Sequence, residues 1–188
     1  MDTNKDLFWQ LLEAYHPKAE AFCRRLTGNL ADGGDLYHDA ILLAWRKFDS
    51  LRDYDSFKPW LYRIIVNIHK GQKRGIWRRL FQPLAEQETE VLPISDPTNQ
   101  LAVKILVQKA LMRLSAKDRA LILLFEIEGW SIGELANLEG KPEGTIKSRL
   151  ARTRAAMRNM LMGSVSLNMN IQSKEEAKYA APETRPGI

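Results

Sequence analysis

Residues 131–154 combine features typical of a DNA-reading motif. Ser131 and Glu134 have the spacing of a capping box, in which the Ser hydroxyl accepts from the Glu N–H while the carboxylate reaches back. Gly140 suits the left-handed position that ends a short helix, and Pro142 suits the first turn of the next helix. This succession predicts a helix-turn-helix, whose second helix enters the major groove of duplex DNA.

The exposed side of that second helix is predicted to carry side chains of the kinds that bind DNA. We expect Thr145, Lys147, Ser148, Arg149 and Arg152 on it. Arg149 or Arg152 is suited to binding guanine with two hydrogen bonds, a contact that contributes about 1–3 kcal/mol of base discrimination. Lys147 and Arg154 are better suited to phosphates. The alternative is an ordinary helical hairpin with a basic outer face.

A second basic surface has a different character. Residues 58–80 contain seven Lys and Arg and no acid, with aromatic residues between them. Aromatic faces stack unpaired bases and the cations follow the backbone, so this stretch predicts a surface for single-stranded or opened DNA. Its members are Trp60, Tyr62, Arg63, Asn67, His69, Lys70, Lys73 and Arg74. Trp60 is in register with apolar neighbours, so the alternative for this residue is a place in the core.

The residues that often carry catalysis are not arranged for it. The three histidines have no metal-ligand spacing, and Cys23 lies on an apolar helical stripe, which favours a buried structural thiol. Asp35 and Asp39 lie one helical turn apart, a spacing common on solvated surfaces. No phosphate-binding glycine loop is found. We therefore expect a protein that is not an enzyme and that uses no cofactor or metal.

The elements that position these surfaces are predicted to be helices. Apolar residues recur three and four apart between Leu7 and Leu26, where Pro17 should kink or split the helix. A turn is expected at 29–34, a helix at 35–48, a loop at 49–55 and a third helix from Ser56 to about residue 74. The second half repeats the helical pattern. The fold class is therefore all-α, with two small helical domains.

Charge and composition divide the chain further. The 188 residues carry 28 Lys and Arg against 23 Asp and Glu, and residues 82–97 are acidic and contain three prolines. We expect domains at 1–74 and 98–162, a linker at 75–97, and a flexible tail at 163–188. A single cysteine excludes an internal disulfide. No apolar stretch reaches the roughly 18 residues of a membrane span, and the N-terminus lacks a secretory signal, so the expected location is the cytoplasm.

Together these residues resemble a bacterial RNA polymerase sigma factor of the extracytoplasmic-function (ECF) subfamily, over roughly residues 7–161. The motifs that carry the resemblance are Asp35-Leu36-Tyr37-His38-Asp39-Ala40, Phe57-Lys58-Pro59-Trp60-Leu61-Tyr62-Arg63-Ile64, and Pro142-Glu143-Gly144-Thr145-Ile146-Lys147-Ser148-Arg149-Leu150. Tyr37 and His38 depart from the family, which usually has a small apolar residue followed by Gln or Glu there. The Gly163–Ile188 tail extends past the family's usual end.

The resemblance implies three sets of contacts. The set implied for core RNA polymerase is Asp35, Leu36, Asp39, Ala40, Leu43, Arg46 and Phe48. The set implied for recognition and melting of the −10 element is Asp53, Tyr54, Ser56, Phe57, Trp60, Tyr62, Arg63, Asn67, Lys70, Lys73 and Arg74. The set implied for the −35 duplex is Ser131, Lys141, Pro142, Glu143, Thr145, Lys147, Ser148, Arg149, Arg152 and Arg154. The family also implies an acidic linker threaded through polymerase, and an inhibitory anti-sigma partner.

Two other functions are weighed against a sigma factor. A free-standing helix-turn-helix regulator would explain residues 131–154 and leave the acid-free block at 58–80 unexplained. It would bind its duplex specifically without polymerase, whereas a sigma factor binds weakly alone. A helical adaptor with incidental basic faces would show no sequence preference.

Overall fold

The computed structural model describes the backbone of residues 3–79 and 100–179, and side chains within 6–71 and 101–163. In these ranges the chain is helical and contains no strand, as expected for an all-α fold. Most of the predicted linker, residues 80–97, lies outside the described residues. Residues 1–2, 98–99 and 180–188 lie outside them too.

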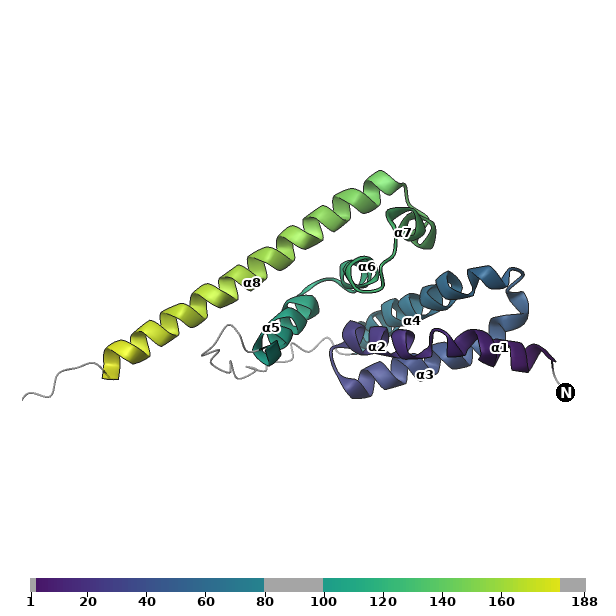
Figure 1. The fold of residues 1–188 in the computed structure, drawn as a ribbon, viewed down its shortest axis with the longest axis horizontal. Helices are drawn as coiled ribbons and strands as arrows, with labels where there is room; N and C mark the ends of the chain where they lie inside the picture. The colour runs from purple at the N-terminus through teal and green to yellow at the C-terminus, as the bar shows by residue number, and fades with distance from the viewer. Residues whose placement is uncertain (1–2, 80–99, 180–188) are drawn as a thin grey trace, which may run out of the picture.

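The first half forms four helices, α1 (Thr3–Glu13), α2 (His16–Thr27), α3 (Leu30–Lys47) and α4 (Phe57–Arg79) (Figure 1). The predicted split at Pro17 is present, because α2 starts at His16 and accommodates the proline in its first turn. Two short 3₁₀ turns, η1 (Phe48–Ser50) and η2 (Tyr54–Ser56), make the connection between α3 and α4.

The turn expected at residues 29–34 is wrong, because α3 begins at Leu30. Asn29 caps the helix, and its side-chain oxygen accepts from the N–H of Asp32 at 2.7 Å. Gly33 belongs to the helix because α2 and α3 pack closely there. A Cβ at Gly33 would lie 2.6 Å from the Cα of Arg24. The glycine that indicated a turn therefore serves helix packing.

The second half forms α5 (Gln100–Arg113), α6 (Ala116–Glu126), α7 (Ile132–Glu139) and α8 (Glu143–Tyr179). The expectation of a tail without structure from residue 163 is wrong, since α8 continues to Tyr179 and extends well away from the rest of the fold (Figure 1). Residues 164–179 contain no proline and several strong helix formers. An established helix gains a hydrogen bond with each added residue, so it can propagate without an apolar stripe. In the same way α4 passes the expected end at residue 74.

The two halves share one hydrophobic core. Phe8, Phe22 and Leu61 of the first half are fully buried, as are Leu135 and Ile146 of the second, and they belong to a single cluster. The two halves therefore pack against each other directly, with α6 and α7 beside α4 (Figure 1).

One buried cation joins the halves. Arg119, in the apolar α6, is fully buried. Its guanidinium donates to the carbonyls of Leu111, Met112 and Leu114 in the second half and, at 2.6 Å, to the carbonyl of Leu26 at the end of α2. Burial lowers the pKa of this guanidinium, and the four carbonyls replace the water that it has lost. In the sequence, the signal for this buried role is a single arginine at the start of the apolar run 119–125.

Candidate nucleic-acid interface

The helix-turn-helix has the local geometry that its sequence predicts. The Ser131 hydroxyl accepts from the N–H of Glu134 at 3.2 Å, and the Glu134 carboxylate accepts from the N–H of Ser131 at 2.7 Å. The N–H and the hydroxyl of Ser131 both donate to the Glu134 carboxylate, and these hydrogen bonds, with a smaller contribution from the charge of Lys58, hold the pKa of Glu134 below its usual value. Gly140 ends α7 with a φ of +62°, which a residue with a side chain rarely adopts. The capping box and the turn fix the angle at which α8 leaves α7.

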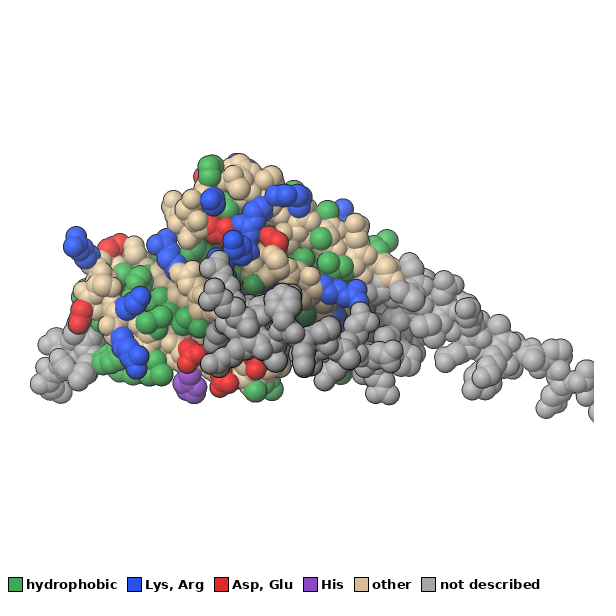
Figure 2. Space-filling view, turned by 180° about the vertical axis from the view of Figure 1, so that it is seen from behind, with side chains coloured by type: hydrophobic (Ala, Val, Ile, Leu, Met, Phe, Trp, Pro, Cys, Tyr) green, Lys and Arg blue, Asp and Glu red, His purple; other side chains and the backbone are tan. Residues whose placement is uncertain are grey.

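The start of α8 presents a polar, mostly basic face to solvent. Ile146 and Leu150 are buried against the rest of the domain, which leaves the opposite side of the helix exposed. The exposed members of the −35 set are Ser131, Lys141, Pro142, Glu143, Thr145, Lys147, Ser148, Arg152 and Arg154. In Figure 2 several Lys and Arg side chains gather where α7 and α8 meet. This is the face that a major groove would meet.

Two of these cations also make ion pairs on the surface. Lys147 lies 3.5 Å from the Glu143 carboxylate one turn earlier. Arg154 pairs with Glu126 at 2.7 Å, and its guanidinium carbon lies 4.8 Å from the centroid of the Phe125 ring. Exposed pairs of this kind contribute little stability and are easily exchanged for a phosphate.

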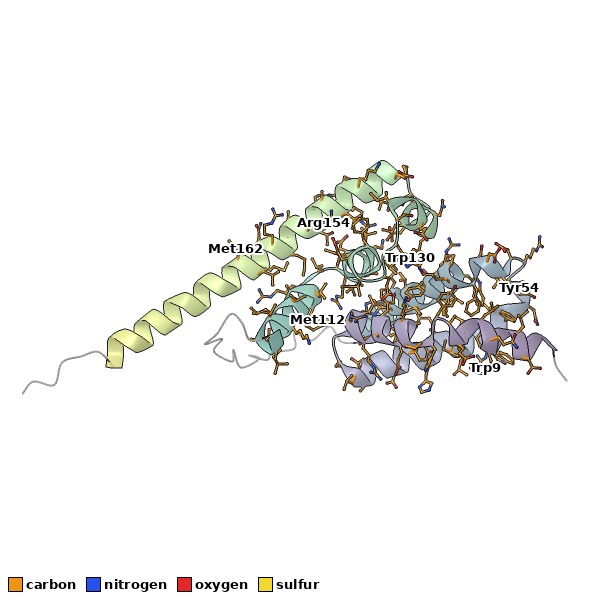
Figure 3. The ribbon with its side chains drawn as sticks, viewed as in Figure 1. Trp9, Tyr54, Met112, Trp130, Arg154 and Met162 are labelled. Atoms are coloured by element: carbon orange, nitrogen blue, oxygen red, sulfur yellow. The ribbon has the colours of Figure 1, made fainter. Side chains whose placement is uncertain are left out.

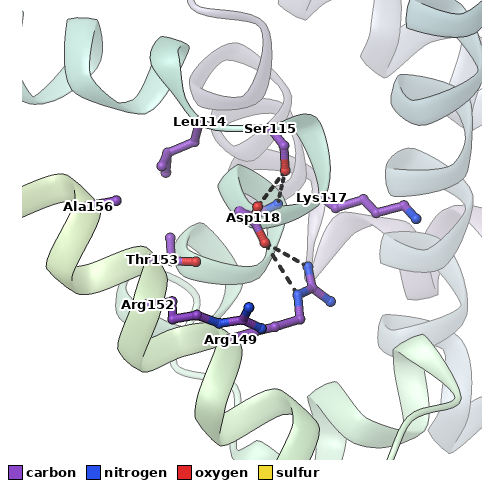
Figure 4. A pocket seen from close by; sticks show the side chains of 8 residues that line it. All are labelled: Leu114, Ser115, Lys117, Asp118, Arg149, Arg152, Thr153 and Ala156. Carbon is purple, nitrogen blue, oxygen red and sulfur yellow. Dashed lines mark hydrogen bonds and ion pairs between the residues drawn. The ribbon is translucent and has the colours of Figure 1, made fainter.

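Arg149 lies differently from its neighbours on α8. Its side chain is only 17% exposed, and its guanidinium contacts Asp118 of α6 at 3.0 Å (Figure 4). It also contacts Glu139 of α7. Burial disfavours the charged carboxyl, but hydrogen bonds from Ser115 and Arg149 outweigh it and hold the pKa of Asp118 below its usual value. Arg149 therefore ties α8 to both preceding helices. Base reading by Arg149 stays a prediction. To contact a base, the guanidinium would have to leave both carboxylates.

Asp118 and Arg149 also border a pocket of about 530 Å³ between the start of α6 and α8 (Figure 4). Its lining includes Lys117, Arg149 and Arg152 as well as the Asp118 carboxylate. The pocket continues the basic face of α8 toward the N-terminus of α6, where helix N–H groups favour an anion.

The −10 set divides by exposure along α4 and the connection before it. Asp53, Tyr54, Arg63 and Asn67 are exposed, Ser56, Trp60 and Lys70 are half-buried, and Phe57 and Tyr62 are buried. Lys73 and Arg74 lie on α4, with side chains outside the described part of the chain. The Ser56 hydroxyl donates to the Asp53 carboxylate at 2.6 Å and so orders the connection. Trp60 packs on the core and against Phe57, with ring centroids 5.9 Å apart, so part of its surface belongs to the core.

The second half covers part of α4, an arrangement that the sequence did not predict. The Tyr62 hydroxyl donates to Glu128 at 2.8 Å, and Arg63 donates to the carbonyl of Asn137 at 3.0 Å. The Lys58 ammonium lies over the Trp130 ring, 5.2 Å from its centroid, and Trp130 lies between the two halves (Figure 3). Burial and the Glu128 carboxylate raise the pKa of the Tyr62 hydroxyl. Glu128 and Trp130 carry no signal in the sequence for this role beyond their place before the helix-turn-helix.

The polymerase set on α3 divides into a surface and its support. Asp35, Asp39 and Arg46 are exposed and Leu43 is half-buried. Leu36, Ala40 and Phe48 are corrected to core residues, because at most 3% of each side chain is accessible. Their apolar side chains hold α3 in place and do not reach a partner.

The described part of the chain contains neither a candidate metal site nor a helix that could span a membrane. Among residues described there, no group of three or more His, Cys, Asp or Glu is placed to hold a metal ion. Cys23 is buried, and burial raises the pKa of its thiol to about 12. None of the described helices is both long and apolar enough to span a membrane.

Both halves match families of known proteins. Residues 11–79 match the sigma-70 region 2 family, and residues 104–157 match sigma-70 region 4. The chain is similar to the ECF RNA polymerase sigma factor SigM of Mycobacterium tuberculosis, with 36% identity over 88% of this chain and 82% of SigM. It is similar to the ECF sigma factor SigW of Bacillus subtilis, with 28% identity over 84% and 90% of the two chains.

A solved structure has the same arrangement of helices. The sigma factor RpoE of Bartonella quintana, crystallised with the anti-sigma factor NepR, superposes with a TM-score of 0.68. Its identity is 30%, over 82% of this chain and 96% of RpoE. Since both regions match in order and a relative shares more than a third of its residues over most of its length, the chain belongs to the ECF RNA polymerase sigma factors.

Proposed function

We propose that this sigma factor directs core RNA polymerase to promoters by reading the −35 duplex with α8 and by recognising and melting the −10 element with α4. The observation that carries the proposal is the presence, in one chain, of two basic helix faces of different character. One is a capped helix-turn-helix, and the other mixes aromatic residues with cations. The first suits groove reading and the second suits unpaired bases.

At the −35 element, we assign base reading to the exposed residues near the start of α8. Arg152 is exposed and has the geometry for bidentate hydrogen bonds to guanine. Lys147 and Arg154 are assigned to phosphates, which set the register of the protein on the duplex. Arg149 is assigned a positioning role, since it ties α8 to Asp118 and Glu139.

At the −10 element, the exposed polar side chains of α4 and of the connection before it are assigned to the opened strand. Asn67 and Arg63 are exposed, and Tyr54 offers an exposed ring, 45% accessible. Extruding a base from the duplex costs a few kcal/mol, which stacking and hydrogen bonds in such a site offset. Trp60 contributes its remaining accessible surface beside these residues.

Polymerase binding is assigned to the exposed face of α3. Asp35, Asp39 and Arg46 supply charges on this face, and the half-buried Leu43 supplies apolar area. Alternating charges around an apolar centre are typical of specific protein interfaces. Tyr37 is buried, so the departure from the family at this position alters the core; the departure at His38 lies on the surface.

Run-off transcription tests the proposal. Core RNA polymerase is supplied with a library of promoter fragments, with and without the full-length protein. Specific starts that require the protein, with two shared elements among the selected promoters, support the assignment. If no fragment is transcribed and the protein does not comigrate with core polymerase, the proposal fails.

A further inference from the structure

The pocket between the start of α6 and α8 combines exposed cations with a buried interior (Figure 4). Lys117 and Arg152 are exposed, whereas Leu114 and Thr153 are buried. The volume of about 530 Å³ lies within the range of about 300–1,000 Å³ that is typical of sites for small molecules. The space between the two helices is therefore large enough for a small ligand.

Thr153 brings a hydroxyl to the buried part of this pocket. The residue is only 4% accessible, and its hydroxyl faces α6 across the pocket (Figure 4). It forms no hydrogen bond with any residue in the described part of the chain. A polar group that is buried without a partner costs free energy. A ligand that accepts a hydrogen bond from Thr153 removes this cost, so the hydroxyl indicates a binding site.

The other polar groups of the pocket favour an anion. Neither Lys117 nor Arg152 forms an ion pair with another described residue, so both cations are available to a ligand. The pocket also lies at the N-terminus of α6, an 11-residue helix. The first N–H groups of a helix have no acceptor within the helix and favour negative charge.

One carboxylate lies among these groups, and its charge is already compensated. Asp118 accepts a hydrogen bond from the Ser115 hydroxyl at 2.6 Å and another from the Arg149 guanidinium at 3.0 Å. Three cations thus line the pocket with one paired carboxylate, which leaves an excess of two positive charges. This excess suits a phosphate group, which carries nearly two negative charges at neutral pH.

The position of Thr153 favours a small molecule over the backbone of duplex DNA. Thr153 lies on the buried side of α8 with Ile146 and Leu150, whereas a duplex would meet the opposite, exposed side. A duplex phosphate would stay at the exposed cations, but a small molecule can bring its phosphate to the buried hydroxyl. Leu114 and the half-buried Ala156 supply apolar surface for the rest of such a ligand.

We propose that the pocket between α6 and α8 binds a small organic phosphate, whose phosphate group is held by Lys117, Arg152 and Thr153. The organic part of the ligand lies against Leu114 and Ala156. Because Arg152 is also assigned to the −35 duplex, the ligand and the duplex compete for the same guanidinium. This competition rests on the proposed function of α8, whereas the binding site does not.

Calorimetric titration of the free full-length protein tests the site. ADP serves as the organic phosphate, adenosine carries the same organic part without phosphate, and pyrophosphate carries phosphate alone. Thr153→Val removes the hydroxyl and keeps the shape of the side chain. Thr145→Val makes the same change at an exposed position of α8 outside the pocket and is the matched control. We expect adenosine not to bind, pyrophosphate to bind more weakly than ADP, and Thr153→Val to weaken ADP binding about fivefold relative to Thr145→Val, the factor for one hydrogen bond.

A second variant removes one of the available cations. Lys117 is exposed, so Lys117→Ala should fold like the wild type. It should weaken ADP binding about threefold relative to Lys104→Ala, which removes a charge from the exposed side of α5. If Thr153→Val fails to fold in a thermal melt, the comparison of these two lysine variants decides.

Filter binding of the polymerase holoenzyme to promoter DNA tests the competition. With ADP at ten times its Kd, mutually exclusive binding should lower the apparent affinity for the promoter about tenfold. Holoenzyme that contains Thr153→Val should lose less affinity at the same ADP concentration, because this variant binds less ADP.

Four results would overturn the proposal. They are no binding of ADP, equal binding of ADP and adenosine, equal ADP affinity in Thr153→Val and Thr145→Val, and pyrophosphate binding as tight as that of ADP, which would assign the pocket to an inorganic anion. ADP binding that leaves promoter affinity unchanged would reject the competition and keep the site. Run-off transcription that requires the protein, together with no binding of ADP, would reject this inference and leave the proposed function intact.

Discussion

The two helices assigned to DNA, α8 and α4, are presented in opposite ways. The basic residues at the start of α8 project into solvent from a helix whose other side is packed on α6 and α7. The face of α4 that carries Lys58 and Tyr62 is packed against the second half of the same chain. The face of α8 that we assign to duplex DNA is therefore accessible, whereas part of the helix that we assign to melting is covered.

This difference corresponds to the form of DNA that we propose for each helix. Duplex DNA is present before polymerase acts, so an accessible −35 reader needs no prior event. At a promoter, unpaired bases appear only after the duplex opens, and a fully exposed stacking surface would bind any single strand without sequence preference.

The largest expected effect comes from removing the cation that serves both regions. Arg119→Ala removes the hydrogen bonds that the guanidinium donates to four carbonyls and opens a cavity, so we expect it to lower the free energy of unfolding by about 2–4 kcal/mol. Denaturant unfolding followed by circular dichroism measures it. Arg113→Ala, an exposed arginine of α5, is the control and should stay within about 0.5 kcal/mol. A loss of similar size in both variants would contradict the role of Arg119.

The next effect separates two arginines within α8. Arg149→Ala should lower the free energy of unfolding by about 1–3 kcal/mol, because Asp118 and Glu139 lose their buried partner. Arg152→Ala should leave stability unchanged and weaken binding at a particular promoter position. Thermal melts and competition binding with single-base promoter variants measure the two effects. A stable Arg149→Ala protein with altered base preference would show that Arg149 reads DNA.

A change of about 1 kcal/mol is expected at the capping box. Ser131→Ala removes the acceptor for the Glu134 N–H and loosens the start of α7, and with it the turn that orients α8. Differential scanning calorimetry should show a lower melting temperature. Ser148→Ala removes only the exposed hydrogen bond that the Ser148 hydroxyl donates to the Thr145 carbonyl within α8, so this variant should melt like the wild type. Equal melting of the two serine variants would contradict the importance of the cap.

Acidification should give a smaller effect at Asp118. Its pKa is lower in the folded protein than in the unfolded chain, so its contribution to stability is complete above the unfolded pKa and is lost as the pH falls through the folded value. Because the carboxylate is about one-third exposed, we expect less than about 1 kcal/mol. Unfolding curves of the wild type and Asp118→Asn should converge as the pH falls below 4. A difference in stability between the wild type and Asp118→Asn that grows on acidification would contradict the lowered pKa of Asp118.

The smallest effect is on salt dependence. Lys147→Ala should weaken binding of the polymerase holoenzyme to all promoters evenly and lower the slope of log affinity against log salt by about one. Filter binding across a salt series measures it. Lys104→Ala, on the exposed side of α5, removes a charge far from the assigned surface and should leave the slope unchanged. Loss confined to one promoter sequence would instead assign Lys147 to a base.

Local signals in the sequence determined the helix-turn-helix, the split at Pro17 and the all-α fold. The Ser131–Glu134 cap and the left-handed Gly140 depend on neighbours within a few residues, so their spacing suffices to predict them. Burial of one helix side likewise follows from apolar residues three and four apart. The turn predicted around Gly33 was wrong because this glycine allows close packing with α2, a contact that helical spacing does not encode.

Only the tertiary structure decided which charged and aromatic side chains are already engaged. Arg149 and Arg152 both belong to the basic stretch of α8, yet Asp118 and Glu139 hold the first while the second is exposed. Tyr62 and Glu128 are 66 residues apart and meet across two domains. Periodicity fixes the side of a helix on which a residue lies, but long-range contacts form only when whole domains pack. The sequence therefore determined the two helices that we assign to DNA, and the packing of the domains decided that one of them is partly covered.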